Sequence, residues 1–138
     1  MNWKLILGLS TFGLLMAFGT VFLIPSSIEP AFWGVIFLIS AFLLARSLSR
    51  RHFLNGLMVG IVNSVWVTVA HIVFFERYLA GHASEAVMAA LLPPGRSLKL
   101  AMAVMGPIVG VISGCVMGVL AWIGGKFVKP RSAAVSAN

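Results

Sequence analysis

Residues 98–127 read LKLAMAVMGPIVGVISGCVMGVLAWIGGKF, and Lys99 and Lys126 are the only charged residues among these thirty. A helix needs about 20 mostly apolar residues to cross the hydrocarbon core of a bilayer. The stretch is long enough for that, and glycine recurs at every fourth position from residue 106 to residue 118. It therefore predicts a transmembrane helix with one glycine-rich face.

Three more apolar runs, at about residues 3–24, 31–48 and 53–75, are long enough to span a bilayer. Prolines at both ends of the loop between the first two runs favour a clean end to each helix. We expect an all-α polytopic membrane protein with four transmembrane helices, the fourth at residues 98–127. These form a single domain of residues 1–129, and a disordered cytoplasmic tail follows at residues 130–138.

The composition supports this class. Of the 138 residues, 60% are hydrophobic and only 9% are charged, whereas soluble domains carry about 25% charged residues. The composition therefore excludes an ordinary soluble enzyme, a disordered protein and a secreted domain held together by disulfides.

The net charge of +7 has a topological explanation, because Lys and Arg collect in cytoplasmic loops. With the N-terminus inside, only three basic residues lie outside, and the remaining seven lie inside (Lys4, Arg46, Arg50, Arg51, Lys126, Lys129 and Arg131). This pattern predicts cytoplasmic N- and C-termini and a multi-pass protein of the cell inner (plasma) membrane. A patch for acidic lipid or nucleic acid is the other explanation, and we expect no nucleic-acid partner.

The loop at residues 76–96 has its own helical signal. Ser84 is a candidate N-cap for a short helix from Glu85 to Leu92, which Pro93 would end. This helix either lies on the outer membrane interface and caps the bundle, or docks a partner.

Two ridges of small residues indicate close helix packing. Small residues four apart let helix backbones approach in lipid, where the hydrophobic effect does not drive association. The matching ridge of the third span continues through Ser64 and Thr68, and the helix-packing glycines are Gly56, Gly60, Gly106, Gly110, Gly114 and Gly118. The sequence leaves open whether the ridges pack within one chain or between chains.

Polar residues of the third span are the candidate functional groups. Asn63 and Ser64 lie at the depth of Ser113 in an antiparallel pair, and we expect them to exchange hydrogen bonds with Ser113 and Cys115. The alternative is a polar or relay path, for which the candidates are Asn63, Ser64, Thr68, His71 and Glu76. His82 and Glu85 could join an outer cluster.

Pro107 predicts a kink in the fourth span, because it leaves the carbonyl of Ala103 without its helical donor. His71 lies at a similar depth, and we expect it to donate to this region.

Catalysis, a cofactor and a metal are not expected. The chain has no aspartate and three peripheral glutamates, and its one cysteine has no base beside it. Its Cys and His residues lack metal-ligand spacing.

The entry RSLSRRHF at residues 46–53, the segment FLNGLMVGIVNS at residues 53–64 and the glycine-rich last span ending at Lys126 resemble small four-helix bacterial inner-membrane proteins of the domain-of-unknown-function type. This resemblance implies a fold and a location, and no functional residue.

The sequence favours a non-enzymatic structural or accessory subunit that packs through its glycine ridges. The alternative is a small oligomeric channel, pore or transporter that uses the polar residues of the third span. The expected partners are membrane lipids, with a homo-oligomer or a larger membrane complex as further possibilities.

Overall fold

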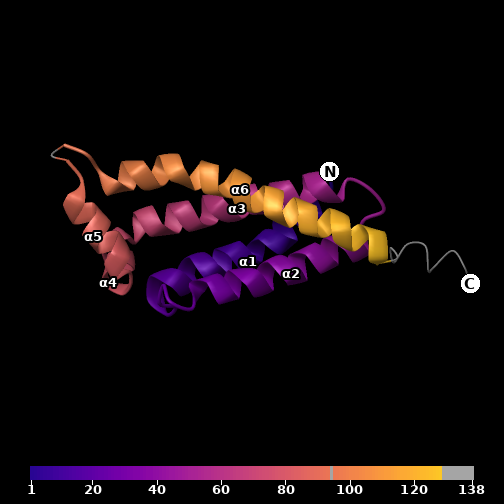
Figure 1. Cartoon of the computed structure of the whole chain (residues 1–138), viewed down its shortest axis with the longest axis horizontal. Coiled ribbons are helices and arrows are strands. Elements are labelled where there is room, and N and C mark those ends of the chain that lie inside the picture. The colour runs from indigo at the N-terminus through magenta and orange to yellow at the C-terminus, as the bar shows by residue number, and fades with distance from the viewer. Residues whose placement is uncertain (94, 129–138) are drawn as a thin grey trace, which may run out of the picture.

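The structure is a computed structural model that describes residues 1–93 and 95–128. These residues form six helices and no strand: α1 (Trp3–Phe22), α2 (Glu29–Ser47), α3 (His52–Val73), α4 (Phe75–Gly81), α5 (Ala83–Leu91) and α6 (Leu98–Phe127). The four long helices run along the molecule, and α4 and α5 lie at one end of it (Figure 1). The tail predicted at residues 130–138 lies outside the described residues.

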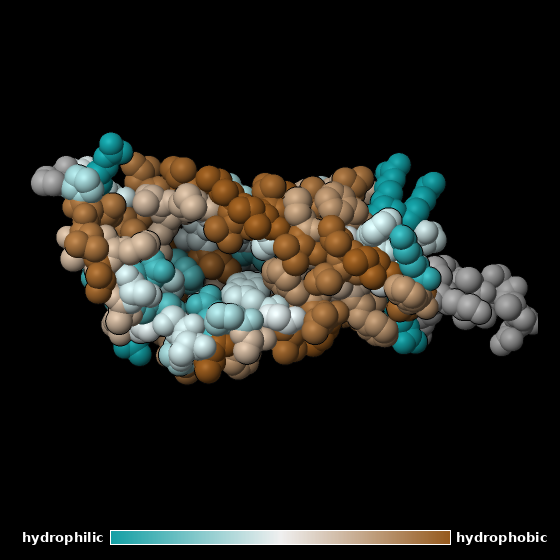
Figure 2. Space-filling model, viewed as in Figure 1, coloured by the Kyte–Doolittle hydropathy of each residue, from teal (hydrophilic) through white to brown (hydrophobic). Residues whose placement is uncertain are grey.

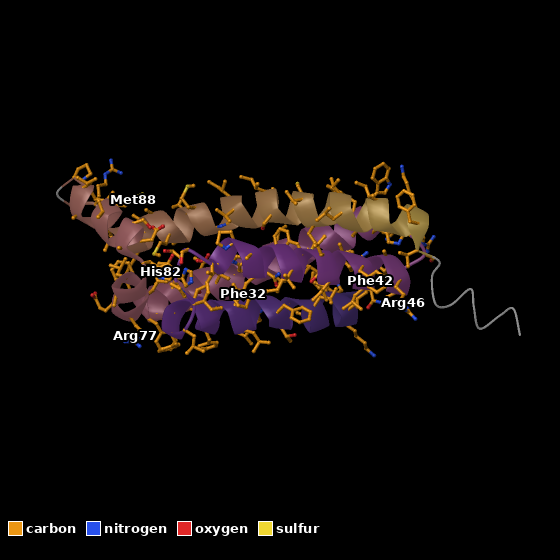
Figure 3. All side chains as sticks on the ribbon, turned by 60° about the horizontal axis from the view of Figure 1, so that its bottom comes forward. Phe32, Phe42, Arg46, Arg77, His82 and Met88 are labelled. Atoms are coloured by element: carbon orange, nitrogen blue, oxygen red, sulfur yellow. The ribbon has the colours of Figure 1, made fainter. Side chains whose placement is uncertain are left out.

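The four long helices α1, α2, α3 and α6 are long and apolar enough to cross a membrane. Apolar side chains cover much of the visible face, and hydrophilic ones gather toward its ends and over part of the half nearer α4 and α5 (Figure 2). By helix length and hydropathy, the chain is a multi-pass membrane protein, as the sequence predicts. Arg46 and Arg77 lie at opposite ends (Figure 3). We call these the basic end, near Arg46, and the α4–α5 end.

The bounds of the long helices differ from the predicted ones by at most two residues, and those of α6 agree with the prediction. The first helix ends at Phe22, and the backbone N–H groups of Leu23 and Ile24 both donate to the carbonyl of Gly19. The third ends at Val73, where Phe74 turns the chain into α4 and packs its ring 5.4 Å from that of Phe22 on α1. The end of α3 at Val73 therefore coincides with a contact to α1. The sequence around Val73 does not specify this contact.

The segment between α3 and α6 corrects one prediction. It contains two short helices, and the second begins at Ala83, with His82 at its N-cap position. Ser84 therefore lies inside α5, and no side chain caps the helix. The expected capping role of Ser84 is wrong, because the helix begins before it.

The closest helix contact is an antiparallel seam between α3 and α6. A Cβ atom added to Gly56 would lie 2.7 Å from the Cα of Gly118, and one added to Gly60 would overlap Gly114. Farther along the seam, Ser64 faces Gly110 and Thr68 faces Gly106 in the same register. Both predicted ridges therefore pack against each other within one chain.

The other two long helices each pack on one helix of this seam, and all four contribute to a shared core. Helix α1 packs on α3, where Gly13 leaves room for the Asn63 side chain. Helix α2 packs on α6 near the basic end, where a Cβ added to Gly124 would lie 3.1 Å from the Cβ of Ala45. The buried core lies in this half of the bundle and includes Leu44 and Met117.

The seam predicts the stability of alanine variants. Gly60→Ala puts a methyl group into the α6 backbone, so we expect it to lower the free energy of unfolding by about 1–3 kcal/mol. Gly34→Ala is the matched control, because no atom of the described residues lies within 4 Å of a Cβ at this helical position. It should leave stability unchanged or raise it slightly, since alanine favours a helix over glycine by about 1 kcal/mol. Reversible unfolding in lipid bicelles measures both, and equal stabilities would contradict the seam.

Candidate functional site

A half-open cavity of about 410 Å³ lies between α2, α3 and α6 in the half of the bundle nearer α4 and α5. Figure 2 shows the surface hollowed between α2 and α6 in this half, with hydrophilic residues around the hollow. Its wall residues come from five helices: Glu29, Trp33 and Phe37 of α2; Gly60, Asn63, Ser64, Val67, Thr68 and His71 of α3; Tyr78 of α4; Glu85 of α5; and Met102, Met105, Gly106, Val109 and Ser113 of α6.

The four predicted polar residues of α3 all contribute to this cavity. Ser64 and Thr68 also face the glycines of α6, so they border both the seam and the cavity. We call Asn63, Ser64, Thr68 and His71 the polar stripe. The cavity therefore brings the polar stripe together within one chain, with α2 as the opposite wall.

The hydroxyl groups near mid-span bond to their own helices. Ser64 Oγ donates to the Ile61 carbonyl at 2.8 Å, and Ser113 Oγ donates to the Gly110 carbonyl at 3.2 Å. Serine in a helix often bonds to the preceding turn in this way. The expected exchange of hydrogen bonds among Asn63, Ser64, Ser113 and Cys115 is therefore wrong for both serines.

Asn63 is buried without a hydrogen-bond partner. Its side chain lies against Gly13 of α1, the residue is only 3% exposed, and neither amide atom is bonded in the described part of the chain. An unpaired buried amide costs about 1–3 kcal/mol.

His71 bonds to α1 rather than to the kink region of α6. Its Nε2 atom lies 2.8 Å from Thr20 Oγ1, and both residues are buried. The expected donation to the carbonyl that Pro107 leaves free is wrong, because Thr20 takes this place. Pro107 itself is exposed within the continuous helix α6.

Three stacked rings lead from the polar stripe to the α4–α5 end. The His71 and Tyr78 ring centroids are 3.9 Å apart, and those of Tyr78 and His82 are 4.1 Å apart. The spacing of four residues between Tyr78 and His82 and the turn at Phe74 align these rings. The stack therefore joins α3 to the short helices.

His82 connects the short helices to the start of α2 (Figure 3). Its Nδ1 lies 2.9 Å from the Tyr78 carbonyl, so Nδ1 must carry a hydrogen. Its Nε2 lies 3.5 Å from Glu29 Oε2, and a neutral imidazole would present a lone pair to this carboxylate. The contact is attractive only with an added proton between the two groups.

Two carboxylates give the cavity a negative end. Glu29 accepts a hydrogen bond from Trp33 Nε1 at 3.1 Å, and Glu85 lines the cavity from α5. Burial, with the charges of Glu85 and Glu29, raises the pKa of Tyr78 above its ordinary range. The Tyr78 phenol therefore stays neutral, and it adds no charge to the end of the cavity where the two carboxylates lie.

Glu76 does not belong to this site, because it is exposed and absent from the cavity wall. Glu29, Trp33 and Tyr78 belong to the site although they were not among the predicted site residues. The spacing of four between Glu29 and Trp33 was the one available signal, since it places both on one helix face. Among the described residues, no three His, Cys, Asp or Glu side chains are grouped as metal ligands would be.

Comparison of the chain with protein-family models, with curated proteins and with solved structures gives no match in any of the three.

The unpaired amide predicts the effect of Asn63→Leu. Leucine has a similar branched shape, and its apolar side chain needs no hydrogen-bond partner at this position. We expect the variant to be as stable as the parent or up to about 1–3 kcal/mol more stable in reversible unfolding. A clear loss of stability would mean that Asn63 has a partner that these contacts do not include.

Proposed function

We propose that this protein binds a small ligand in the cavity and acts as its carrier or receptor in the membrane. The observation that supports this most is that the polar stripe lines a cavity within a single chain. A volume of about 410 Å³ lies in the range of small-molecule sites. Mostly apolar walls with a few polar groups are also typical of such sites.

The accessory-subunit hypothesis loses its specific support. It had the glycine faces pack helices within the chain and also against another copy or a larger complex, and Gly60 and Gly114 are taken up by packing against each other inside the chain. The channel or transporter hypothesis keeps part of its support, because the polar stripe borders an open space. The geometry favours a site in one chain over the lumen of an oligomer.

We also propose that the protein is not an enzyme and that lipids, not nucleic acids, surround it. The lining hydroxyl groups of Ser64 and Ser113 bond to their own helices, and His71 bonds away to α1. Basic residues favour the end near Arg46 as the cytoplasmic one. The cavity would then lie in the outer half of a cell inner membrane.

Thiol labelling tests whether water and solutes reach the cavity. Cys115→Ala removes the one cysteine of the sequence, and Ser113→Cys then places a thiol on the cavity wall. We expect a water-soluble maleimide to label this thiol in proteoliposomes, because labelling needs a hydrated thiolate.

Ile112→Cys is the matched control. It is the preceding residue of α6, and its side chain is 61% exposed on the apolar surface, so lipid should protect it. Ser84→Cys on α5 is exposed and reports that the reagent works. Resistance of both α6 thiols, with labelling at position 84, would contradict the proposed function.

A further inference from the structure

The charge of the cavity is opposite to that of the chain. The chain has ten Lys and Arg residues and three Asp and Glu residues, yet no Lys or Arg of the described residues is on the cavity wall. Glu29 and Glu85 are on it, and they come from different helices. Low-dielectric walls strengthen the attraction of such a site for a cation.

Aromatic rings accompany these carboxylates. Trp33 lies beside Glu29 and donates to it, and Tyr78 lines the same end of the cavity. The faces of such rings attract cations, above all organic ammonium groups. Carboxylates together with aromatic faces favour an organic cation over a strongly hydrated metal ion, for which no grouped ligands exist among the described residues.

The remaining wall is apolar and adaptable. Its lining includes Phe37, Val67, Met102, Met105 and Val109, and methionine side chains adjust to ligands of irregular shape. The hollow also opens on the side of the bundle, where a bilayer would surround it (Figure 2).

We propose that the ligand is a lipophilic organic amine, whose cationic nitrogen lies near Glu29 and Glu85 and whose apolar body lies against α6. This inference rests on the proposed function, since it names the ligand class of the same cavity. The carboxylates lie at the α4–α5 end, so the amine takes the orientation of an amphiphile in the outer half of the membrane.

Protection of the cavity thiol tests the ligand class. The probes are 4-phenylbutylamine, 4-phenylbutanol and 4-phenylbutyrate, which share one apolar body and differ in charge. In the Cys115→Ala, Ser113→Cys protein, we expect the amine to protect the thiol at about tenfold lower concentration than the alcohol. The carboxylate should protect least. Ethylamine, which lacks the apolar body, should need a far higher concentration than 4-phenylbutylamine.

Carboxylate variants connect this preference to the cavity. Glu85→Gln should remove most of the advantage of the amine over the alcohol, and Glu29→Gln is the second variant. Glu85 is the safer first choice, because Glu29 also contacts Trp33 and His82. Glu76→Gln is the matched control, since it removes a charge of the same sign outside the cavity and should keep the full preference.

The outcomes separate the two proposals. If the thiol at position 113 resists the maleimide in the absence of any probe, the proposed function fails. If it is labelled and all three phenylbutyl probes protect equally, the cavity stands and the amine class is overturned. Equal potency of ethylamine and 4-phenylbutylamine, or a preference unchanged by both Glu85→Gln and Glu29→Gln, also overturns it.

Discussion

The α3 and α6 backbones approach each other so closely that the positions of the polar stripe and of the cavity follow from their packing. Lipid tails are as apolar as the side chains they contact, so helices in a bilayer gain little from hiding apolar surface. Gly56 and Gly60 instead let α6 come so close that a single Cβ atom would meet its backbone. Since the register of these glycines is fixed, Ser64 and Thr68 fall opposite Gly110 and Gly106, and the depth of the polar stripe is fixed with them.

The cavity exists because α2 covers the α3–α6 seam closely only near the basic end. Helix α2 can rest closely on α6 where small residues such as Ala45 and Gly124 meet, near the basic end. Toward the α4–α5 end, Trp33 and Phe37 occupy α2, and they stand across the cavity from α6. The stacked rings from His71 to His82 join the short helices to α3 at this end, where His82 lies beside Glu29. The same arrangement of helices therefore gives the cavity an acidic and aromatic end and an apolar wall along the rest of its length.

The features of the fold that depend on local periodicity could be predicted from the sequence. Apolar length gave four spans, and the fourfold spacing of Gly106 to Gly118 indicated the ridge that packs on α3. Contacts between side chains of different helices could not be predicted in this way. Thr20 is a lone polar residue near the end of an apolar span, so nothing local marks it as the partner of His71. The end of α3 at Val73 coincides with ring contacts to α1. The cavity exists because α2 does not pack closely on α6 in the half nearer α4 and α5. Neither has a signature in the segment concerned.

A ligand site in this cavity requires α2 and α6 to be farther apart beside the cavity than near the basic end, and paired spin labels measure this separation directly. In the Cys115→Ala background, one pair joins Phe32 to Val111 beside the cavity, and a second joins Phe42 to Ile123 near the basic end, all at exposed positions. Double electron–electron resonance in nanodiscs should give a longer mean distance for the pair beside the cavity than for the other. Equal distances, or a shorter one beside the cavity, would mean that α2 closes over the polar stripe and that no ligand site exists there.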